Sequence, residues 1–166
     1  MKKSIVILGV AILSMALVSN VMAQATANQT VSLAVNAVYK IATSGNPGGL
    51  TITTGTAGTD ALTTVSDNTT NYSITQNFAG TVKVTANLDA ALQAGYILQM
   101  NLASTKGTSA GTVDVSGTTP GAAVNVVTGV AMGADAAQTI TYTFGANASA
   151  GTLLSTNKIV TLTLTN

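Results

Sequence analysis

Hydrophobic and polar residues alternate along much of the chain from residue 31 onward, with the period of two that is typical of a β-strand with one buried face. Val31, Leu33 and Val35 alternate with Ser, Ala and Asn residues, and this pattern predicts a first strand over residues 31–37. Val38 breaks the alternation. We therefore expect a bulge or a change of sheet next to Val38.

The strongest pattern for a pair of strands lies in the middle of the chain. Tyr72 and Ile74 alternate with polar residues, and the apolar positions between Val82 and Leu88 do the same after a loop that contains Gly80. Two alternating runs joined by a short loop with a glycine predict a β-hairpin.

Further short strands are predicted along the rest of the chain. They lie at residues 50–54, 61–65, 98–103, 112–115, 123–127, 139–144 and 159–165, and Gly or Pro residues separate most of them. Residues 89–93 allow one helical turn, but no amphipathic helix of about ten residues is visible, which argues against a parallel α/β fold. We expect an all-β fold, a single immunoglobulin-like antiparallel β-sandwich of about 8–10 short strands over residues 31–166.

The first 23 residues have the layout of a secretory signal peptide. Lys2 and Lys3 precede an apolar run at residues 5–18, and small or apolar residues end at Ala23. The alternative is a membrane anchor, but the run is shorter than the ~18–20 apolar residues that span a bilayer. We expect a signal-peptide helix at 1–23, cleavage after Ala23, a flexible tail at 24–30 and the sandwich domain at 31–166.

The composition narrows the chemistry of the mature chain. The sequence has no Arg, Glu, His, Cys or Trp, and charged residues make up 7% of it, against about 25% in typical soluble domains. Imidazole and thiolate metal ligands, disulfides and a Ser-His-Asp triad are therefore excluded. We expect no enzyme activity, no cofactor and no metal site.

Net charge argues against nucleic acid as a partner. The whole chain carries a formal charge of +1, and removal of residues 1–23 leaves four Lys and five Asp, hence a charge of −1. A nearly neutral protein has no basic surface for nucleic acid or for anionic lipid. After signal cleavage we also expect no stable membrane insertion.

The carboxylates are the first candidates for a functional site. They are Asp60, Asp67, Asp89, Asp114 and Asp135, and none follows the spacing of a calcium loop. Asp60 and Asp67 with Asn68 allow one shared cation, whereas turn residues that bind their own backbone are the other interpretation. A pair of glycosidase carboxylates is disfavoured because no Glu and no Trp is present.

Two other surface features are candidates for contact with a partner. Thr-x-Thr runs occur at residues 51–53, 139–143 and 161–165. If the Thr side chains of these runs align in rows, they can bind ice or a crystalline polymer. If they do not align, they are the solvent-exposed face of ordinary antiparallel strands. Phe78 lies in the predicted hairpin loop, where it either contacts a partner or folds back over the end of the sandwich.

The N-terminal segment is the most suggestive feature. Residues 24–30 are polar and uncharged and lead directly into the alternating Val31, Leu33 and Val35. Such a segment can add a strand to the open sheet edge of a neighbouring copy. The alternative is that both chain ends pair within their own domain. Natural edge strands usually carry Lys or Pro, and this chain has few of either, which is compatible with assembly.

The mature chain resembles small, cysteine-free surface proteins of Gram-negative bacteria, similar in pattern to fimbrial-type and spore-coat-U-like immunoglobulin-like sandwiches. The stretches that carry the resemblance are residues 70–77 (TNYSITQN), 82–88 (VKVTANL), 98–104 (LQMNLAS), 107–113 (GTSAGTV) and the terminal VTLTLTN. The chain departs from both groups in lacking their paired Cys. The resemblance implies an exported surface protein, and no catalytic residue can be carried over from these families to this chain.

We therefore expect a secreted, non-catalytic structural or adhesive protein of the bacterial cell surface, a fibre or matrix subunit that assembles by β-strand contacts. Its partner would then be a second copy of itself. The alternative is a module that binds an extracellular polysaccharide or another polymer. The expected location is the cell surface or the medium, with the periplasm as the alternative.

Overall fold

The computed structural model describes residues 25–166 of the chain, and the predicted signal peptide lies outside these residues. The chain divides into two units at the junction of Ala34 and Val35. In the first unit, residues 25–34 form neither strand nor helix, and their side chains are exposed to solvent. The second unit, Val35–Asn166, contains every strand of the described chain.

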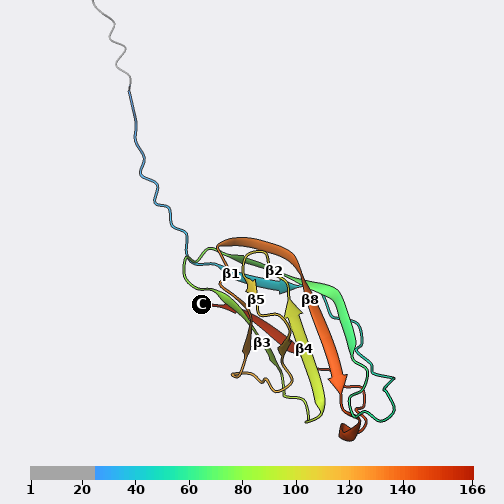
Figure 1. Cartoon of the computed structure of the whole chain (residues 1–166). Coiled ribbons are helices and arrows are strands. Elements are labelled where there is room, and N and C mark those ends of the chain that lie inside the picture. The colour runs from blue at the N-terminus through green and yellow to red at the C-terminus, as the bar shows by residue number, and fades with distance from the viewer. Residues whose placement is uncertain (1–24) are drawn as a thin grey trace, which may run out of the picture. The chain divides into compact units, whose positions relative to one another are not determined.

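Nine strands form two antiparallel sheets (Figure 1). The first sheet has the order β1 (Tyr39–Thr43), β2 (Val65–Gln76), β8 (Gly133–Ala146), β4 (Tyr96–Leu102) and β6 (Val113–Asp114). The second has the order β5 (Thr108–Ser109), β7 (Val124–Thr128), β3 (Lys83–Leu88) and β9 (Val160–Thr165). A single 3₁₀ turn, η1 (Ala148–Ala150), is the only helical element of the described residues.

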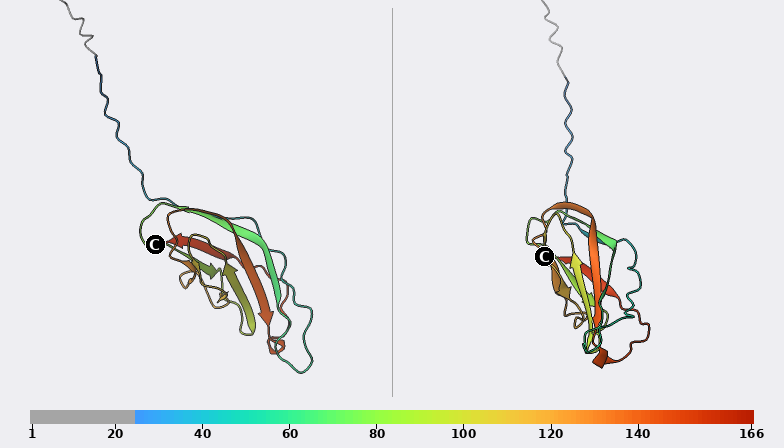
Figure 2. Two further views of the ribbon diagram at one scale, coloured as in Figure 1. Left: turned by 45° about the horizontal axis from the view of Figure 1, so that its top comes forward. Right: turned by 45° about the vertical axis from the view of Figure 1, so that its right-hand side comes forward.

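The two sheets bury their inner faces against each other, and Figure 2 shows them as two layers of strands. Tyr72, Met100 and Ile140 of the first sheet pack in one core with Leu88 and Val126 of the second. Inward residues alternate with outward ones along β4, as the period of two requires. The all-β, sandwich-like fold predicted from the sequence is therefore confirmed.

One glycine permits a close approach between a loop and the second sheet. A Cβ atom on Gly107 would lie 2.7 Å from Val127 Cγ1 and 2.9 Å from the backbone oxygen of Thr128. Both distances are shorter than carbon and oxygen atoms tolerate, and the backbone oxygen has little freedom to move. Gly107 thus lets the chain pass directly over β7 before β5 begins.

The predicted hairpin is wrong. β2 pairs with β1 on one side and with β8 on the other, so no edge of β2 is left for β3. The chain instead crosses between the sheets after Gln76, and β3 pairs with β7 and β9. The buried Gln76 side chain supports this crossing, because its Oε1 accepts the N–H of Phe78 at 2.7 Å and its Nε2 donates to the Val130 oxygen at 3.0 Å.

Several predicted strand positions also differ from the structure. The first strand begins at Tyr39, so residues 31–37 form no strand. Residues 50–54 are irregular. Within residues 61–65, Ala61 and Leu62 form isolated β-bridges, and Val65 is the first residue of β2. Residues 89–93 form no helical turn. Leu50 and Leu92 of these segments are partly buried and pack against the core from irregular structure, so a local apolar pattern does not require a strand or a helix there.

The core predicts a large difference between two leucines. Leu102 is 0% exposed and Leu154 is 87% exposed. Replacement of Leu102 by Ala should lower the free energy of unfolding by about 2–5 kcal/mol, since it removes buried methyl groups and leaves a cavity. The matched Leu154→Ala variant should change it by less than about 0.5 kcal/mol. Urea denaturation of the purified proteins measures both values, and equal losses would contradict this assignment of the core.

Candidate functional site

Each of the five carboxylates accepts a hydrogen bond from a backbone N–H, which belongs to a loop or turn in four cases and to β2 in the case of Asp67. The pairs are Asp60 with Ser149 (2.8 Å), Asp67 with Thr69 (3.1 Å), Asp89 with Ile159 (3.1 Å), Asp114 with Ser116 (2.8 Å) and Asp135 with Thr105 (2.9 Å). Within residues 25–166, no three acidic side chains gather in a group that could hold a metal ion. Four of the carboxylates thus hold loops or turns, whereas Asp67 binds Thr69 within its own strand, and Asp60 and Asp67 have different partners.

Asp135 accepts more hydrogen bonds than any of the other four carboxylates. It is 2% exposed at the start of β8, and it accepts hydrogen bonds from the hydroxyls of Ser104 (2.8 Å) and Thr105 (2.7 Å) and from the N–H of Lys106 (3.1 Å). Burial by itself would raise the pKa of Asp135. The hydrogen bonds from Ser104, Thr105 and Lys106 outweigh burial and hold the pKa below its usual 3.8.

Tyr72 fastens the same loop from β2. Its hydroxyl donates a hydrogen bond of 2.6 Å to the oxygen of Ala103. Burial raises the pKa of Tyr72, and the nearby charge of Asp135 adds to this increase while a hydrogen bond with Ser104 opposes it. The hydroxyl therefore keeps its proton and its role as a donor. The loop that follows β4 is thus held by two buried side chains, Asp135 and Tyr72.

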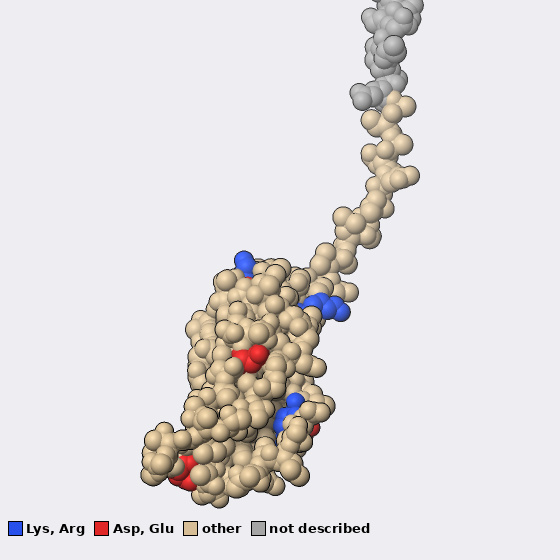
Figure 3. Space-filling view, turned by 90° about the vertical axis from the view of Figure 1, so that its right-hand side faces the viewer, with Lys and Arg blue, Asp and Glu red and all other residues tan. Residues whose placement is uncertain are grey.

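The protein surface carries few charges. In the face shown in Figure 3, Lys and Asp side chains are isolated spots on a surface that is otherwise uncharged. No ionic patch on this face offers a site for a strongly charged ligand. Contacts on such a surface depend on apolar side chains, hydroxyls, amides and free backbone groups.

The free backbone groups lie at the edges of the two sheets. β5 and β6 are edges of only two residues each, and short edges resist pairing with other chains. β1 and β9 are longer, with five and six residues. β1 carries Lys40, whereas β9 has the sequence VTLTLT, with no charge and no Pro. β9 is therefore the least protected edge of the described sheets.

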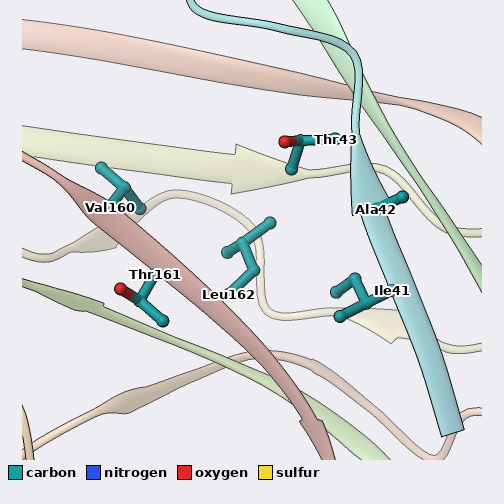
Figure 4. A pocket seen from close by; sticks show the side chains of 6 residues that line it. All are labelled: Ile41, Ala42, Thr43, Val160, Thr161 and Leu162. Atoms are coloured by element: carbon teal, nitrogen blue, oxygen red, sulfur yellow. The ribbon is translucent and has the colours of Figure 1, made fainter.

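A groove lies between β1 and β9. These two strands contact each other across the open side of the two sheets but share no backbone pairing. The space between them has a volume of about 280 Å³, and its lining residues are Ile41, Ala42, Thr43, Val160, Thr161 and Leu162. In Figure 4, Ile41 from β1 and Leu162 from β9 extend toward each other across this space. The sequence pattern gave no sign that these two strands meet.

The N-terminal segment predicted to assemble exposes its apolar side chains. Val31 is 71%, Leu33 88% and Val35 86% exposed. Such exposure of alternating aliphatic side chains is unfavourable in water, because burial of each side chain would lower the free energy by about 1.5–3 kcal/mol. The role of these residues in assembly remains a prediction, and their exposure is compatible with it.

Asn77 is a residue that the sequence pattern did not single out. Its side-chain Oδ1 accepts the N–H of Val38 at 2.6 Å, and its Nδ2 donates to the oxygen of Asn36 at 3.0 Å. Its own N–H donates to the Val38 oxygen at 3.3 Å. Asn77 therefore prolongs the pairing of β1 with β2 to residues 36–38, although these residues belong to no strand.

Phe78, the predicted contact residue, is half-buried beside the start of β1. Its ring lies 5.9 Å from that of Tyr39, centroid to centroid, and covers the position that a Cβ atom of Gly80 would occupy. The ring thus packs against Tyr39 of β1 and over Gly80. A contact of Phe78 with a partner remains a prediction.

Two of the three Thr-x-Thr runs lie on strands. Residues 139–143 belong to β8 and residues 161–165 to β9, whereas residues 51–53 are irregular. Thr163 lies opposite Thr85 of β3, and Thr85 lies opposite Asn125 of β7. Directly opposite residues share one face of a sheet. The second sheet therefore presents a short, uncharged row of two hydroxyls and one amide.

The hydrogen bonds of Asp135 predict a specific dependence of stability on pH. Because its pKa is lower in the folded state, its carboxylate stabilises the fold above about pH 4, and this contribution is lost as the pH falls through the folded pKa. Asp135→Asn should lower the free energy of unfolding by about 2–4 kcal/mol at pH 7 and by much less at pH 2.

The matched control is Asp114→Asn, whose hydrogen bonds to Ser116 are exposed to solvent. This control should lose less than about 1 kcal/mol. Urea unfolding of each protein from pH 7 to pH 2 gives these values. A loss in Asp135→Asn that does not vary with pH would contradict the role of the charge.

The described residues include no helix that is both long and apolar enough to cross a membrane. No protein-family model matches the chain, and comparisons with curated proteins and with solved structures also find no match. The resemblance to fimbrial-type and spore-coat-U-like proteins thus rests on sequence pattern alone. The fold, the open edges and the exposed N-terminal segment are the observations from which a function must be inferred.

Proposed function

We propose that the protein is a secreted, non-catalytic structural or adhesive protein of the bacterial cell surface, a subunit that assembles through β-strand contacts. In this proposal residues 31–35 of one copy add a strand at the free edge of β9 in the next. The observation that carries the proposal is the groove between the unpaired edges of β1 and β9.

The incoming segment suits this groove in pattern and in charge. Alternate residues of a strand lie about 6.6–6.8 Å apart on the same face, so Val31, Leu33 and Val35 form one apolar row. Ile41, Val160 and Leu162 offer aliphatic contacts in the groove. No charged residue lies within residues 25–39, so no ionic group has to leave water during insertion.

The edge of β9 adds hydrogen bonds to these apolar contacts. Its backbone pairs with β3 on one side only, and the opposite side has donors and acceptors to offer. A strand added there would extend the second sheet, with main-chain bonds for affinity and side-chain pockets for specificity. The two-residue edges β5 and β6 are too short to compete.

Export, a Gram-negative cell surface and an immunoglobulin-like strand connection belong to the same proposal. The support for export is the pattern of residues 1–23, and the support for the family is the resemblance of the mature sequence. A surface of low charge and an inventory without His, Cys or Glu favour a structural role over catalysis.

A cysteine cross-link tests the proposed contact, because the chain has no Cys of its own. The exported protein with Leu33→Cys and Thr43→Cys places one thiol in the segment and one in the lining of the groove. Treatment with a short bis-maleimide should yield a ladder of covalent multimers in denaturing electrophoresis. In light scattering, the Cys-free protein should form multimers, and deletion of residues 24–35 should abolish them.

The control pairs Leu33→Cys with Thr112→Cys, an exposed position between β5 and β6 at the opposite edges of the sheets. It should give no ladder beyond dimers that form by chance collision. Equal ladders from both pairs would contradict the groove as the contact. A protein that stays monomeric in light scattering at millimolar concentration would contradict assembly itself.

A second candidate function is favoured by one observation, the uncharged row Asn125, Thr85 and Thr163 on the outer face of the second sheet. Neighbouring strands lie about 4.7–4.9 Å apart, so the row presents hydrogen-bonding groups at a regular interval. Such a row suits a neutral extracellular polysaccharide, which is also rich in hydroxyls.

Affinity electrophoresis in gels that contain neutral polysaccharides tests this second candidate. The monomer should be retarded, and Thr85→Val with Thr163→Val should remove the retardation. Val keeps the shape and the β propensity of Thr at these outward positions, so the fold should persist. Unchanged retardation in the double variant would show that the row is not the binding site.

A further inference from the structure

We infer that Asn77 is a positioning residue that directs residues 31–35 to a second copy and prevents them from pairing with their own β1. The inference rests on the proposed assembly and concerns its regulation. It starts from the three hydrogen bonds between Asn77 and residues 36–38, which hold this stretch alongside the end of β2.

Pairing within one chain would satisfy the same apolar residues. β1 is the edge of the first sheet, and its free side borders the groove. A hairpin with a loop at residues 36–38 would set Val35 opposite Tyr39 and Leu33 opposite Ile41. Opposite residues share a face, so Leu33 would reach the groove without a partner molecule. Self-pairing is therefore the direct competitor of assembly.

Asn77 binds the first and the last of the three residues that would form this loop, Asn36 and Val38. A hairpin requires the chain to reverse between Val35 and Tyr39. The Asn77 side chain instead accepts the N–H of Val38 and donates to the oxygen of Asn36, which are the groups that the reversal would turn away. Breaking both bonds is the first cost of self-pairing.

The loop sequence adds a second cost. A three-residue hairpin loop usually has its last residue in the left-handed conformation with positive φ, where glycine is favoured. That residue would be Val38, and β-branched residues are strongly disfavoured there. The sequence Asn36-Ala37-Val38 has no glycine. The two side-chain hydrogen bonds of Asn77, which we call the Asn77 clamp, and the β-branched side chain of Val38 thus oppose the same chain reversal.

The size of the effect follows from the exposure of the clamp. Both side-chain bonds of Asn77 are exposed to solvent, where hydrogen bonds are at the weak end of their range. Their joint loss should shift the balance between self-pairing and assembly by about tenfold. Relief of the unfavourable conformation at residue 38 should add a further factor of about ten.

The test compares the exported protein with Asn77→Ala, Val38→Gly and the double variant. Sedimentation measures the association constant, and hydrogen exchange measures protection of the amides at residues 31–35 in dilute, monomeric samples. The double variant should associate about 100-fold more weakly, and its monomer should protect these amides. Asn77→Asp is the matched control for the clamp, because it keeps the acceptor for Val38 but loses the donor to Asn36, and it should lie between Asn77→Ala and the unchanged protein.

The outcomes separate this inference from the proposed function. If the unchanged protein assembles and the double variant assembles equally well, the role of Asn77 is overturned and the proposed function stands. If the unchanged protein never assembles, the proposed function falls and hydrogen exchange decides about Asn77 alone. Protection of residues 31–35 only in the variants then supports the clamp, and equal exchange in all proteins overturns it.

Discussion

Backbone hydrogen bonding at the edges of the two sheets is the constraint on which the rest of the structure depends. An antiparallel sheet that does not close into a barrel leaves one row of donors and acceptors at each edge. Here two edges are reduced to two residues each, in β5 and β6, and the other two, β1 and β9, face one groove. The unsatisfied backbone groups are thus concentrated on one side, where an added strand would find both hydrogen bonds and aliphatic side chains.

The few charged residues serve this architecture. Four of the five carboxylates accept loop or turn N–H groups, and the most buried of them, Asp135, holds the loop after β4 together with Tyr72. Long-range electrostatic repulsion between copies is weak, because the net charge of the chain is close to zero. The edge strand β9 itself carries no charged residue. A protein of this kind approaches another copy without an ionic barrier.

The sequence predicted strands well where the alternation was long and the strand was part of the core. The strands near Leu98, Val124 and Leu162 were placed within a few residues, because burial on one face enforces the period of two. Prediction from the sequence failed where the choice of partner strand determines the structure. Residues 72–76 and 82–88 have the right pattern, yet β1 and β8 occupy both sides of β2, and this competition involves residues far away in the sequence. The groove escaped prediction for the same reason, since β1 and β9 lie near opposite ends of the sandwich sequence.

Residues 31–37 have the alternating pattern of a strand but pair with no strand of their own chain. The pattern carries the apolar row of a buried strand, but the paired part of the chain begins only at Tyr39. A sequence under selection for solubility alone has no reason to keep Val, Leu and Val exposed at alternate positions, since polar residues would be compatible with the same extended chain. The row is understandable if the segment becomes a strand in a state that contains another chain. The Asn77 side chain, which holds residues 36–38 open at the start of β1, then serves to keep the row available for that state.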